Sequence, residues 1–511
     1  MFAQIKSLWI TEPLWRFSPV SAGIFSKGIP MLTFQFSCSD TAQWARDNFI
    51  GARLNDPRRQ RRAVRIAQAM ANFPGKTIPM MFANPNDAKK TYEFFDREEC
   101  TPDNLQMAHR RRTLEQMRQL GQTNVIAEDT SDFSYSGKRP IQGAGPISTG
   151  EEGLQGFRVH TALAARWPSR DQRSPEGRRP PVEILGLADQ TFHVRDADKK
   201  KVREETRWER WQRERETQVW EHTTDRLGPA PRGVRWVRVC DREADIYEFL
   251  DSCQKAGHGF VVRVREDRRL VDPDTMEEMD KVFETSRQTR PLGQFNLPLR
   301  GREGAPERVA RLSASATPVA LRSPLRPSHP LGSRPPIRCT VVRVWEAKPP
   351  KDQEPLEWLL YCDQQVNTFE EAHEVSLQYS CRWLIEEYHK AIKTGMGAER
   401  LQLETASRLF AAIAIMNVVA LRLLDLRERV RINPDGPAQD AGLSDVELRV
   451  LRAHLNRSIE TVRDVALAVG RLGGHMNRKA DGMPGWLTLW RGMQCLLLLT
   501  QGFLLSLKVM D

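Results

Sequence analysis

The sequence lacks the patterns that bind structural metal ions and those that direct a chain to secretion or into a membrane. Its eight cysteines are scattered over 511 residues, with no C-x-x-C pair and no Cys/His cluster at zinc-binding spacing, so we expect a reducing compartment and no structural metal. The first thirty residues contain no basic segment followed by an apolar core and a cleavage site, and they predict no signal peptide. The charge-free stretch at 492–507 has 16 residues, fewer than the roughly 20 of a membrane helix, and predicts a buried or subunit-contacting helix.

Acidic residues are fewer than basic ones. The chain has 77 Lys and Arg against 66 Asp and Glu, a formal net charge of +11. This balance favours a polyanionic partner, nucleic acid before membrane. Because the length of 511 residues exceeds the ~250–300 at which single cores stop growing, we expect about two to four domains.

Arginines are concentrated near the start of the chain. Residues 53–65 contain six arginines and one acid, Asp56. The helical pattern is broken just before Pro57, which suits the first position of a new helix. One interpretation is a surface that contacts phosphate groups, and the other is a solvated basic face. A second helical segment, 103–120, contains Arg110-Arg111-Arg112 and extends the same surface in the first interpretation.

After residue 124 the pattern changes from helices to strands. The apolar run at 125–127 leads directly into Glu128-Asp129-Thr130. Alternating apolar segments at 157–165 and 182–194 predict two further strands. The apolar run at 234–240 then leads into Asp241. Two aspartates are therefore expected at the ends of buried strands.

The segment 379–393 predicts an amphipathic helix. At about 100° of rotation per residue, four of its polar residues fall within roughly a 60° arc of one helix face. Taken alone, it has the pattern of a surface helix with ordinary i,i+4 charge pairs. Together with two strand-end aspartates, however, a carboxylate flanked by a phenol, a guanidinium and an ammonium suits a metal ion beside a phosphate. The polar face comprises Tyr379, Arg382, Glu386 and Lys393, and the apolar face comprises Leu384, Ile385, Tyr388 and Ile392.

Two strand-end aspartates followed by a helical glutamate suggest a shared site for two divalent cations. Asp129, Asp241 and Glu386 supply the hard oxygen ligands that suit Mg²⁺ or Mn²⁺. Two such ions about 4 Å apart can activate a nucleophilic oxygen and stabilise a leaving one during in-line displacement at phosphorus. The hypothesis requires that these three acids meet in the folded chain.

Three motifs, in this order, resemble those of the DDE transposases of the IS-four family. The first is Glu128-Asp129-Thr130 with Ser134-Tyr135, the second is C-D-R-E-A-D-I at 240–246, and the third is Y-x₂-R-x₃-E-x₆-K at 379–393. The resemblance covers about 41–505 of the chain. Further matches are Asp56-Pro57-Arg58-Arg59, Gly395-x-Gly397-Ala398-Glu399-Arg400 and Arg471-Leu472-Gly473-Gly474.

The resemblance implies an α/β fold with an RNase H-like catalytic core. This core is a mixed sheet flanked by helices, with a β-rich insertion, and helical domains precede and follow it. The implied parts are an irregular extension at 1–40, a helical DNA-end-binding domain at 41–120, a catalytic domain at 121–400 with its insertion at about 268–356, and a helical dimerisation region at 401–511.

The resemblance also implies roles for particular residues. Asp129, Asp241 and Glu386 match the catalytic triad and would hold two Mg²⁺ ions, for which Mn²⁺ substitutes. The residues that match positions gripping the DNA backbone near the transposon end are Tyr379, Arg382 and Lys393.

Further DNA contacts follow from the same resemblance. Trp358 and Trp383 match aromatic positions that handle a base flipped out of the DNA end, and packing in the core remains the alternative for both. The N-terminal helices would bind the terminal inverted repeats through Arg58, Arg59 and Arg62.

The implied reaction is cut-and-paste transposition. Water nicks one strand at the transposon end, the freed 3′-hydroxyl attacks the opposite strand to form a hairpin, and a second water opens that hairpin. The 3′ ends then attack target DNA, without a covalent enzyme–DNA intermediate. The implied partners are transposon-end DNA and target DNA, held by a homodimer in a synaptic complex. The expected location is the bacterial cytoplasm at the nucleoid, with no membrane partner.

Two other functions remain open. One is a catalytically silent, transposase-derived DNA-binding protein that inhibits by dimerising or by occupying DNA ends, and the other is an RNase H-like nuclease without strand transfer. Retention of all three acids argues against the first, because a binding module needs no clustered carboxylates near a phosphate. The acids beside the proposed ligands are interpreted as ion-pairing or ligand-orienting residues, and they are Glu128, Asp132, Glu243, Asp245 and Glu387.

Overall fold

The structure is a computed structural model whose described residues form two units. The described residues are 41–136, 140–147, 154–169, 179–195, 215–272, 274–299, 307–324, 334–351, 353–478 and 481–510. The sheet unit comprises the described parts of 110–140 and 144–387, and the helical unit comprises those of 41–109, 141–143 and 388–510. The predicted extension at 1–40 lies outside the described residues.

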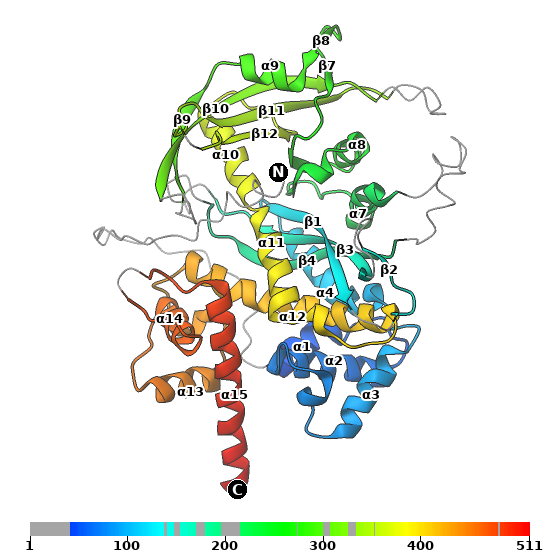
Figure 1. The fold of residues 1–511 in the computed structure, drawn as a ribbon, viewed down its shortest axis with the longest axis vertical. Coiled ribbons are helices and arrows are strands. Elements are labelled where there is room, and N and C mark those ends of the chain that lie inside the picture. The colour runs from blue at the N-terminus through cyan, green and yellow to red at the C-terminus, as the bar shows by residue number, and fades with distance from the viewer. Residues whose placement is uncertain are drawn as a thin grey trace. The chain divides into compact units, whose positions relative to one another are not determined.

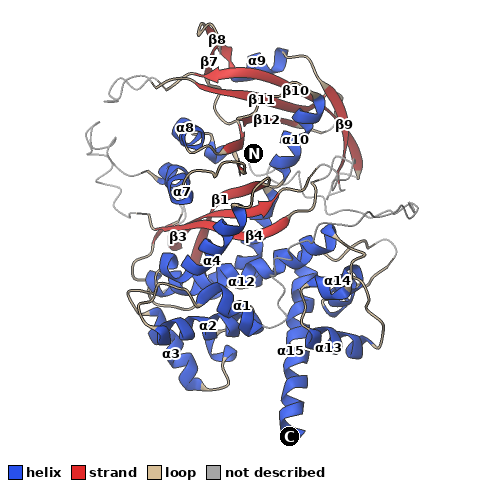
Figure 2. Cartoon of the chain, turned by 180° about the vertical axis from the view of Figure 1, so that it is seen from behind, coloured by secondary structure: helices blue, strands red, loops and turns tan. Residues whose placement is uncertain are grey.

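The sheet unit contains one mixed sheet, which is drawn as red arrows in Figure 2. Its strands within the described residues are β1 (Thr123–Ser136), β2 (Gly145–Pro146), β3 (Leu154–Arg166), β4 (Glu183–His193), β5 (Arg235–Cys240), β6 (Gly259–Arg263), β7 (Arg269–Val271), β8 (Glu278–Lys281), β9 (Gly293–Leu299), β10 (Arg308–Leu321), β11 (Ile337–Glu346) and β12 (Glu357–Cys362). The order across the sheet is β2-β3-β1-β5-β6-β12-β11-β10-β7-β8, with β4 on β3 and β9 on β10 (Figure 1).

Both parallel and antiparallel pairs occur around β1. This strand runs antiparallel to β3 and parallel to β5, and β5 runs parallel to β6. In the β1–β5 ladder, Val125 lies opposite Val237 and Glu128 lies opposite Cys240. Both strands are buried over these positions, as expected for parallel strands covered on both faces. The mixed sheet with flanking helices confirms the predicted α/β class.

Helices of the sheet unit cover the sheet or connect its strands. The helices are α7 (Val219–Leu227), α8 (Tyr247–Lys255), α9 (Val282–Gln288), α10 (Phe369–Ser380) and the start of α11 (Trp383–Lys390). The segment expected as a β-rich insertion, about 268–356, contains β7 to β11 and α9. Because β11 pairs with β12 and β12 pairs with β6, these strands continue the same sheet.

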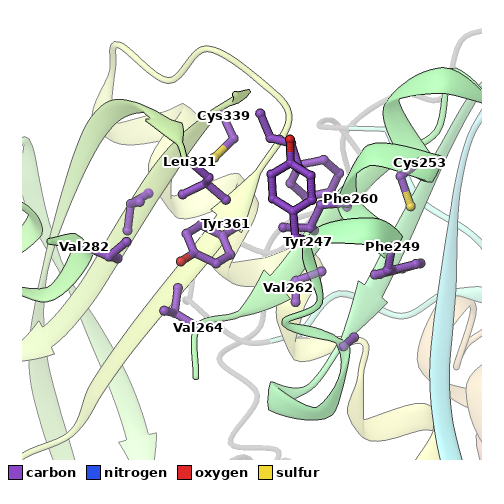
Figure 3. Close-up of a cluster of buried hydrophobic side chains, with 14 of the residues drawn as sticks. Tyr247, Phe249, Cys253, Phe260, Val262, Val264, Val282, Leu321, Cys339 and Tyr361 are labelled. Atoms are coloured by element: carbon purple, nitrogen blue, oxygen red, sulfur yellow. The ribbon is translucent and has the colours of Figure 1, made fainter. Parts of the chain in front are cut away.

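A large apolar cluster holds α8 against the middle of the sheet. Figure 3 shows Tyr247 on α8 beside Phe260 and Val262 on β6, with Leu321 of β10 and Tyr361 of β12 in the same cluster. All five are almost completely buried. Burial of aromatic and branched side chains is the main favourable contribution to folding, at about 1.5–3 kcal/mol for each apolar side chain. The cluster therefore fixes β6 and the segment between β5 and β6, which includes Asp241.

A fully buried ion pair joins β1 to β5. The Arg238 guanidinium donates to both carboxylate oxygens of Glu128, with an Nη2–Oε2 distance of 2.5 Å, and neither residue is exposed. Arg238 also donates to Thr224 Oγ1 at 2.8 Å, and its guanidinium lies 5.1 Å from the ring centroid of Phe249. On the other side of Glu128, His160 Nε2 lies 3.5 Å from a carboxylate oxygen. The pair thereby connects three neighbouring strands with α7 and α8.

The helical unit contains helices from both ends of the chain. Its helices are α1 (Thr41–Phe49), α2 (Pro57–Asn72), α3 (Pro85–Phe95), the first part of α4 (Pro102–Met117), the end of α11, α12 (Ala406–Ile432), α13 (Asp445–Leu455), α14 (Val462–Leu472) and α15 (Trp486–Met510). Contacts of α12 with α2, α3, α14 and α15 make it the central helix. The N-terminal and C-terminal helices, expected as separate parts, therefore pack together.

Local chemistry explains where α2 begins. Pro57 occupies its first turn, and the Asp56 carboxylate accepts a hydrogen bond from the Arg58 backbone N–H at 2.7 Å. This is the arrangement of a capped helix N-terminus, which satisfies a backbone donor that has no partner inside the helix. The predicted break before Pro57 is therefore confirmed.

Two helices in the described part of the chain are long and apolar enough to span a membrane, α12 and α15. Length and composition alone do not distinguish a spanning helix from the core helix of a soluble protein. Most of α12 is buried inside its unit, whereas little of α15 is. The apolar surface of α15 is therefore left mostly uncovered within one chain.

We expect Glu128→Gln or Arg238→Met to lower the free energy of unfolding of the sheet unit by about 3–5 kcal/mol, because each leaves one buried charge without its partner. The double variant Glu128→Leu/Arg238→Met should recover most of this loss, since removing both charges also removes the desolvation cost. Calorimetric unfolding checks both results. Glu243→Gln, at a half-exposed neighbouring position, is the matched control and should change stability by less than about 0.5 kcal/mol. Single variants as stable as the control would contradict the expectation.

Candidate active site

The strand register places two aspartates at neighbouring positions. Paired positions of β1 and β5 end with Glu128 opposite Cys240, and Asp129 and Asp241 are the next residue on each chain segment. Side chains alternate between the faces of a sheet, so Glu128 and Asp129 project to opposite faces. Asp241 keeps an extended backbone, and its carboxylate accepts from the Glu243 N–H at 2.8 Å, which caps the turn Arg242–Ala244.

Arg382 links the first aspartate to the glutamate. Its Nη1 atom lies 3.0 Å from Glu386 Oε1 and 3.9 Å from Asp129 Oδ2. Arg382 and Asp129 are buried, while the Glu386 side chain is 24% exposed. Asp129 and Glu386, which are 257 positions apart in the sequence, are thus brought to one guanidinium.

Electrostatics show that Asp241 belongs to the same group. Burial raises the pKa of Asp129 to about 8, and repulsion by Asp241 and, more weakly, by Glu386 adds to this increase. The Arg382 guanidinium and the Thr130 backbone N–H, which donates to Asp129 Oδ1 at 2.8 Å, oppose the increase. Each carboxyl group close to Asp129 therefore disfavours its ionised form. The structure brings Asp241 and Glu386 within electrostatic range of Asp129.

The donor set fits divalent cations. Carboxylate oxygens are the ligands that Mg²⁺ and Mn²⁺ prefer, and mutual repulsion among three carboxyl groups is relieved by a cation between them. Among the described residues, no three His, Cys, Asp or Glu side chains are grouped closely enough to hold a metal ion as they stand. The Arg382 guanidinium lies between Asp129 and Glu386, so their oxygens are turned toward it.

A second arginine near the site was missed by sequence reasoning. Arg263 ends β6, the strand next to β5, and its guanidinium hydrogen-bonds to the Tyr379 hydroxyl. Burial raises the pKa of Tyr379, while Arg382 and Arg263 act in the opposite direction. The signal that could have found Arg263 is its place at the carboxyl end of a parallel strand adjacent to the one that precedes Asp241.

The predicted single helix over 379–393 is wrong. Tyr379 lies in α10, Arg382 lies in a turn before α11, Glu386 lies in α11, and Lys393 lies in a π-helical turn, Ala391–Gly395. Backbone N–H groups around the break bond to carbonyls three residues earlier, as from Arg382 to Tyr379 at 3.0 Å. Such bonds tighten the chain and change the rotation per residue, so a regular helical wheel no longer applies.

The residues predicted to form the apolar face of this segment are nevertheless buried. Lys393, by contrast, lies in a different unit from Tyr379, Arg382 and Glu386. Lys393 belongs to the helical unit, where its Nζ lies 3.5 Å from Glu399 Oε1. Its contact with DNA therefore stays a prediction. The predicted apolar residues, all almost fully buried, are Leu384, Ile385, Tyr388 and Ile392.

Both tryptophans that were matched to base-handling positions are buried. Trp358 lies in β12 opposite Val344 and is 2% exposed. Trp383 is the first residue of α11 and is also buried. These environments are those of packing residues, which was the alternative for both. A role in handling a flipped base stays a prediction.

The acids beside the proposed ligands have distinct partners. Asp132 accepts from Arg158 Nε at 2.8 Å. The Asp245 carboxylate accepts from the backbone N–H groups of Arg265 and Glu266 and from the Arg268 side chain, so it holds the segment after β6. Glu128 pairs with Arg238, as described above. Glu243 lies 4.0 Å from an Arg158 nitrogen, and Glu387 is buried.

The three N-terminal arginines predicted to bind DNA differ in their surroundings. Arg58 is exposed. Arg59 forms an ion pair with Glu99, and Arg62 Nη1 lies 3.1 Å from Asp87 Oδ1. Only Arg58 of the three is therefore without an acidic partner in the described part of the helical unit.

Comparison with protein families agrees with this geometry. Residues 41–100 match the transposase DNA-binding family model, and residues 152–422 match the transposase DDE domain model. The second match includes Asp241 and Glu386, and Asp129 lies before it. It also confirms the RNase H-like character of the core and makes metal-dependent nuclease or transposase activity on DNA the expected chemistry. Because this match spans more than half of the chain, the protein belongs to the DDE transposase family.

Proposed function

We propose that the protein is a cut-and-paste DNA transposase of the IS-four family, the group that contains the Tn-five transposase. The observation that carries this proposal is the approach of three acids from distant parts of the chain to the Arg382 guanidinium. Asp129, Asp241 and Glu386 would hold two Mg²⁺ ions, for which Mn²⁺ substitutes, and these ions would supply charge stabilisation at the reacting phosphorus.

The cationic residues around the acids would orient the DNA backbone. A guanidinium donates two parallel hydrogen bonds to a phosphate, and Arg382 and Arg263 both belong to the sheet unit. Tyr379 holds the Arg263 guanidinium by a hydrogen bond. Asp129 lies in β1 just past the last residue paired with β5, and Asp241 directly follows β5. Because Arg382 lies close to Asp129 and Glu386, a phosphate held by this arginine would lie beside the carboxylates. This arrangement supports displacement at phosphorus.

Four displacements of one type complete the proposed reaction. Water attacks a phosphorus at the transposon end, and the bond to the 3′ oxygen breaks. The freed 3′-hydroxyl attacks the opposite strand and leaves a hairpin, which a second water opens. The same 3′-hydroxyl then attacks a phosphorus of target DNA. In each step one phosphorus–oxygen bond forms as another breaks, so no side chain is required as a nucleophile.

The binding-only alternative is not favoured by these observations. A buried carboxyl group such as Asp129 is costly to keep close to two others that repel it. A protein that only occupied DNA ends would gain nothing from that cost. The nuclease alternative differs in lacking strand transfer, and the match of residues 41–100 to a transposase DNA-binding family supports a transposase instead. Because its substrates are DNA, we place the protein at the bacterial nucleoid in the cytoplasm.

The arginines of α2 form two groups according to their ion pairs, and Arg59, which pairs with Glu99, belongs to the paired group. Arg62 and Arg65 both contact the buried Asp87 carboxylate of α3, at 3.1 and 2.5 Å. Their charges are therefore used to hold α2 against α3. Arg58 and Arg61 are exposed and form no side-chain ion pair within the described residues. An unpaired guanidinium can contact a phosphate without first breaking an internal bond, so we assign the phosphate contacts to Arg58 and Arg61.

Exposed apolar side chains on α15 support the proposed homodimer. Soluble chains seldom leave large apolar side chains together on their surface unless another molecule covers them. A second copy of the chain is the partner that symmetric assembly provides most simply. The exposed large apolar residues of this helix are Leu498, Phe503, Leu504, Leu505, Leu507, Val509 and Met510.

We expect Asp129→Asn, Asp241→Asn and Glu386→Gln each to lower DNA cleavage by at least about 10³-fold, because each removes a charge that the reaction centre requires. Cleavage of DNA carrying the element's ends, in Mg²⁺ or Mn²⁺, measures this effect, and a gel-shift assay should show DNA binding largely unchanged. Glu243→Gln is the control, since Glu243 is a neighbouring acid outside the proposed triad, and it should keep activity. Near-normal cleavage by any of the three variants would refute the triad.

We expect Arg58→Ala and Arg61→Ala each to weaken DNA binding and to lower the slope of log K against log salt concentration by about 1, since each loses one phosphate contact. Arg62→Ala is the matched control on the same helix. It should leave the slope nearly unchanged and lower the melting temperature, because Asp87 loses a partner. Equal slopes for all three variants would contradict the division into two groups.

We expect the double variant Leu505→Glu/Val509→Glu to convert the homodimer into a monomer, because two charges would be buried at the interface without partners. Light scattering coupled to size-exclusion chromatography measures the molar mass. Lys508→Glu changes an exposed polar position of the same helix and should leave the dimer intact. A dimer that survives both Glu substitutions would exclude α15 as the dimer contact.

A further inference from the structure

The position of Arg382 relative to the acids carries an inference beyond DNA binding. Its Nη1 atom is 3.0 Å from Glu386 and 3.9 Å from Asp129. Its charge also interacts with Asp241. This positive group thus interacts with all three acids that would hold metal ions. Among the described residues, no grouping of three acids is close enough to hold an ion in this arrangement.

We propose that Arg382 acts as a built-in counter-ion, which neutralises the acids in the absence of DNA and must move away before Asp129 and Glu386 can bind divalent cations together. The inference rests on the proposed function of these acids. A guanidinium and a divalent cation compete here because both are stabilised by the same carboxylate oxygens. Either the guanidinium or a divalent cation can relieve the repulsion among the carboxylates, but the two positive groups repel each other if both lie between the same acids.

The backbone around Arg382 restricts how this exchange can occur. The Arg382 N–H bonds to the Tyr379 carbonyl at 3.0 Å, and the Arg382 carbonyl accepts from the Ile385 N–H at 3.1 Å. Because both backbone groups are engaged in the turn between α10 and α11, the guanidinium leaves the acids by rotation of its side chain. The Glu386 side chain is partly exposed, so an approaching phosphate can reach the Arg382–Glu386 contact.

DNA supplies the alternative partner for the guanidinium. A phosphate accepts two parallel hydrogen bonds from Arg, whereas the Asp129 contact at 3.9 Å is too long for one. A phosphate that binds Arg382 would therefore free the carboxylates for metal ions. By linkage, DNA then raises metal affinity, and metal ions raise DNA affinity by the same factor. The chain would assemble its reactive centre only when DNA is present.

Arg263 provides a matched control for the charge of Arg382. Both arginines lie in the sheet unit and near Tyr379. Arg263, however, hydrogen-bonds to the Tyr379 hydroxyl and forms no ion pair with an acid in the described part of the chain. Its removal should therefore leave the metal-binding carboxylates unaffected.

The test measures Mn²⁺ binding to the full-length protein without DNA. The electron paramagnetic resonance signal of free Mn²⁺, recorded at one pH and ionic strength, reports how much of the ion remains unbound. We expect Arg382→Gln to bind Mn²⁺ at least about fivefold more tightly than the wild type, the lower end of typical coupling between sites. Arg263→Gln should bind as the wild type does. Unchanged or weaker Mn²⁺ binding by Arg382→Gln, or an equal gain in Arg263→Gln, would overturn the proposal.

Two further measurements separate this inference from the proposed function. Asp129→Asn should lose Mn²⁺ binding, and if it binds as tightly as the wild type, the proposed metal site itself is wrong. A random-sequence DNA duplex, with binding of Mn²⁺ to the duplex alone subtracted, should raise the affinity of the wild-type protein for Mn²⁺. This second measurement needs no variant, so it decides the matter even if Arg382→Gln fails to fold. No gain in the presence of the duplex would overturn the role of Arg382.

Discussion

The structure must compensate the negative charge of three acids, Asp129, Asp241 and Glu386, that lie close together. Asp129 is buried close to Asp241 and Glu386, and burial together with repulsion by these two carboxyl groups raises the pKa of Asp129. In the apo chain the only positive charge placed between Asp129 and Glu386 by the described residues is Arg382. The negative charge that would attract divalent cations in the proposed function therefore also opposes the close approach of the two aspartates.

The fold opposes this repulsion on the opposite face of the sheet. Glu128 precedes Asp129, and its ion pair with Arg238 joins β1 to β5 near the end of the ladder between them. Side-chain alternation keeps this pair away from the catalytic face. The apolar cluster around Tyr247 holds the segment that follows Asp241. Register, ion pair and core thus act together to keep the two repelling aspartates at neighbouring positions, just past the ladder between β1 and β5.

Sequence reasoning predicted the parts of this arrangement that depend on local pattern. An apolar run followed by an acid identified Asp129 and Asp241, and Pro57 after Asp56 identified the start of α2. The predicted strand end at Asp129 is wrong, because β1 continues to Ser136 by pairing with β3, whereas Asp241 does follow the end of β5. Sequence reasoning also did not predict the turn at Arg382. There the backbone hydrogen bonds join residues three apart instead of four apart, and this change leaves no mark on the spacing of polar residues in the sequence. Nor did it predict that Arg62 is held by Asp87, since that pair is 25 residues apart and forms only when α2 meets α3. Tertiary contacts, rather than composition, decide which charges are available.

Arg238 and Arg382 differ in how firmly each is held by its acidic partners, because they differ in burial and in the number of their hydrogen bonds. Arg238 donates to both oxygens of Glu128 and to Thr224, and it has no exposed surface. Separating that pair would leave two buried ions without partners. Arg382 has one hydrogen bond to a partly exposed Glu386 and a longer contact with Asp129. A phosphate can replace such a contact at small cost, so the first arginine is suited to hold the strands together permanently and the second to be exchanged for a bound ion.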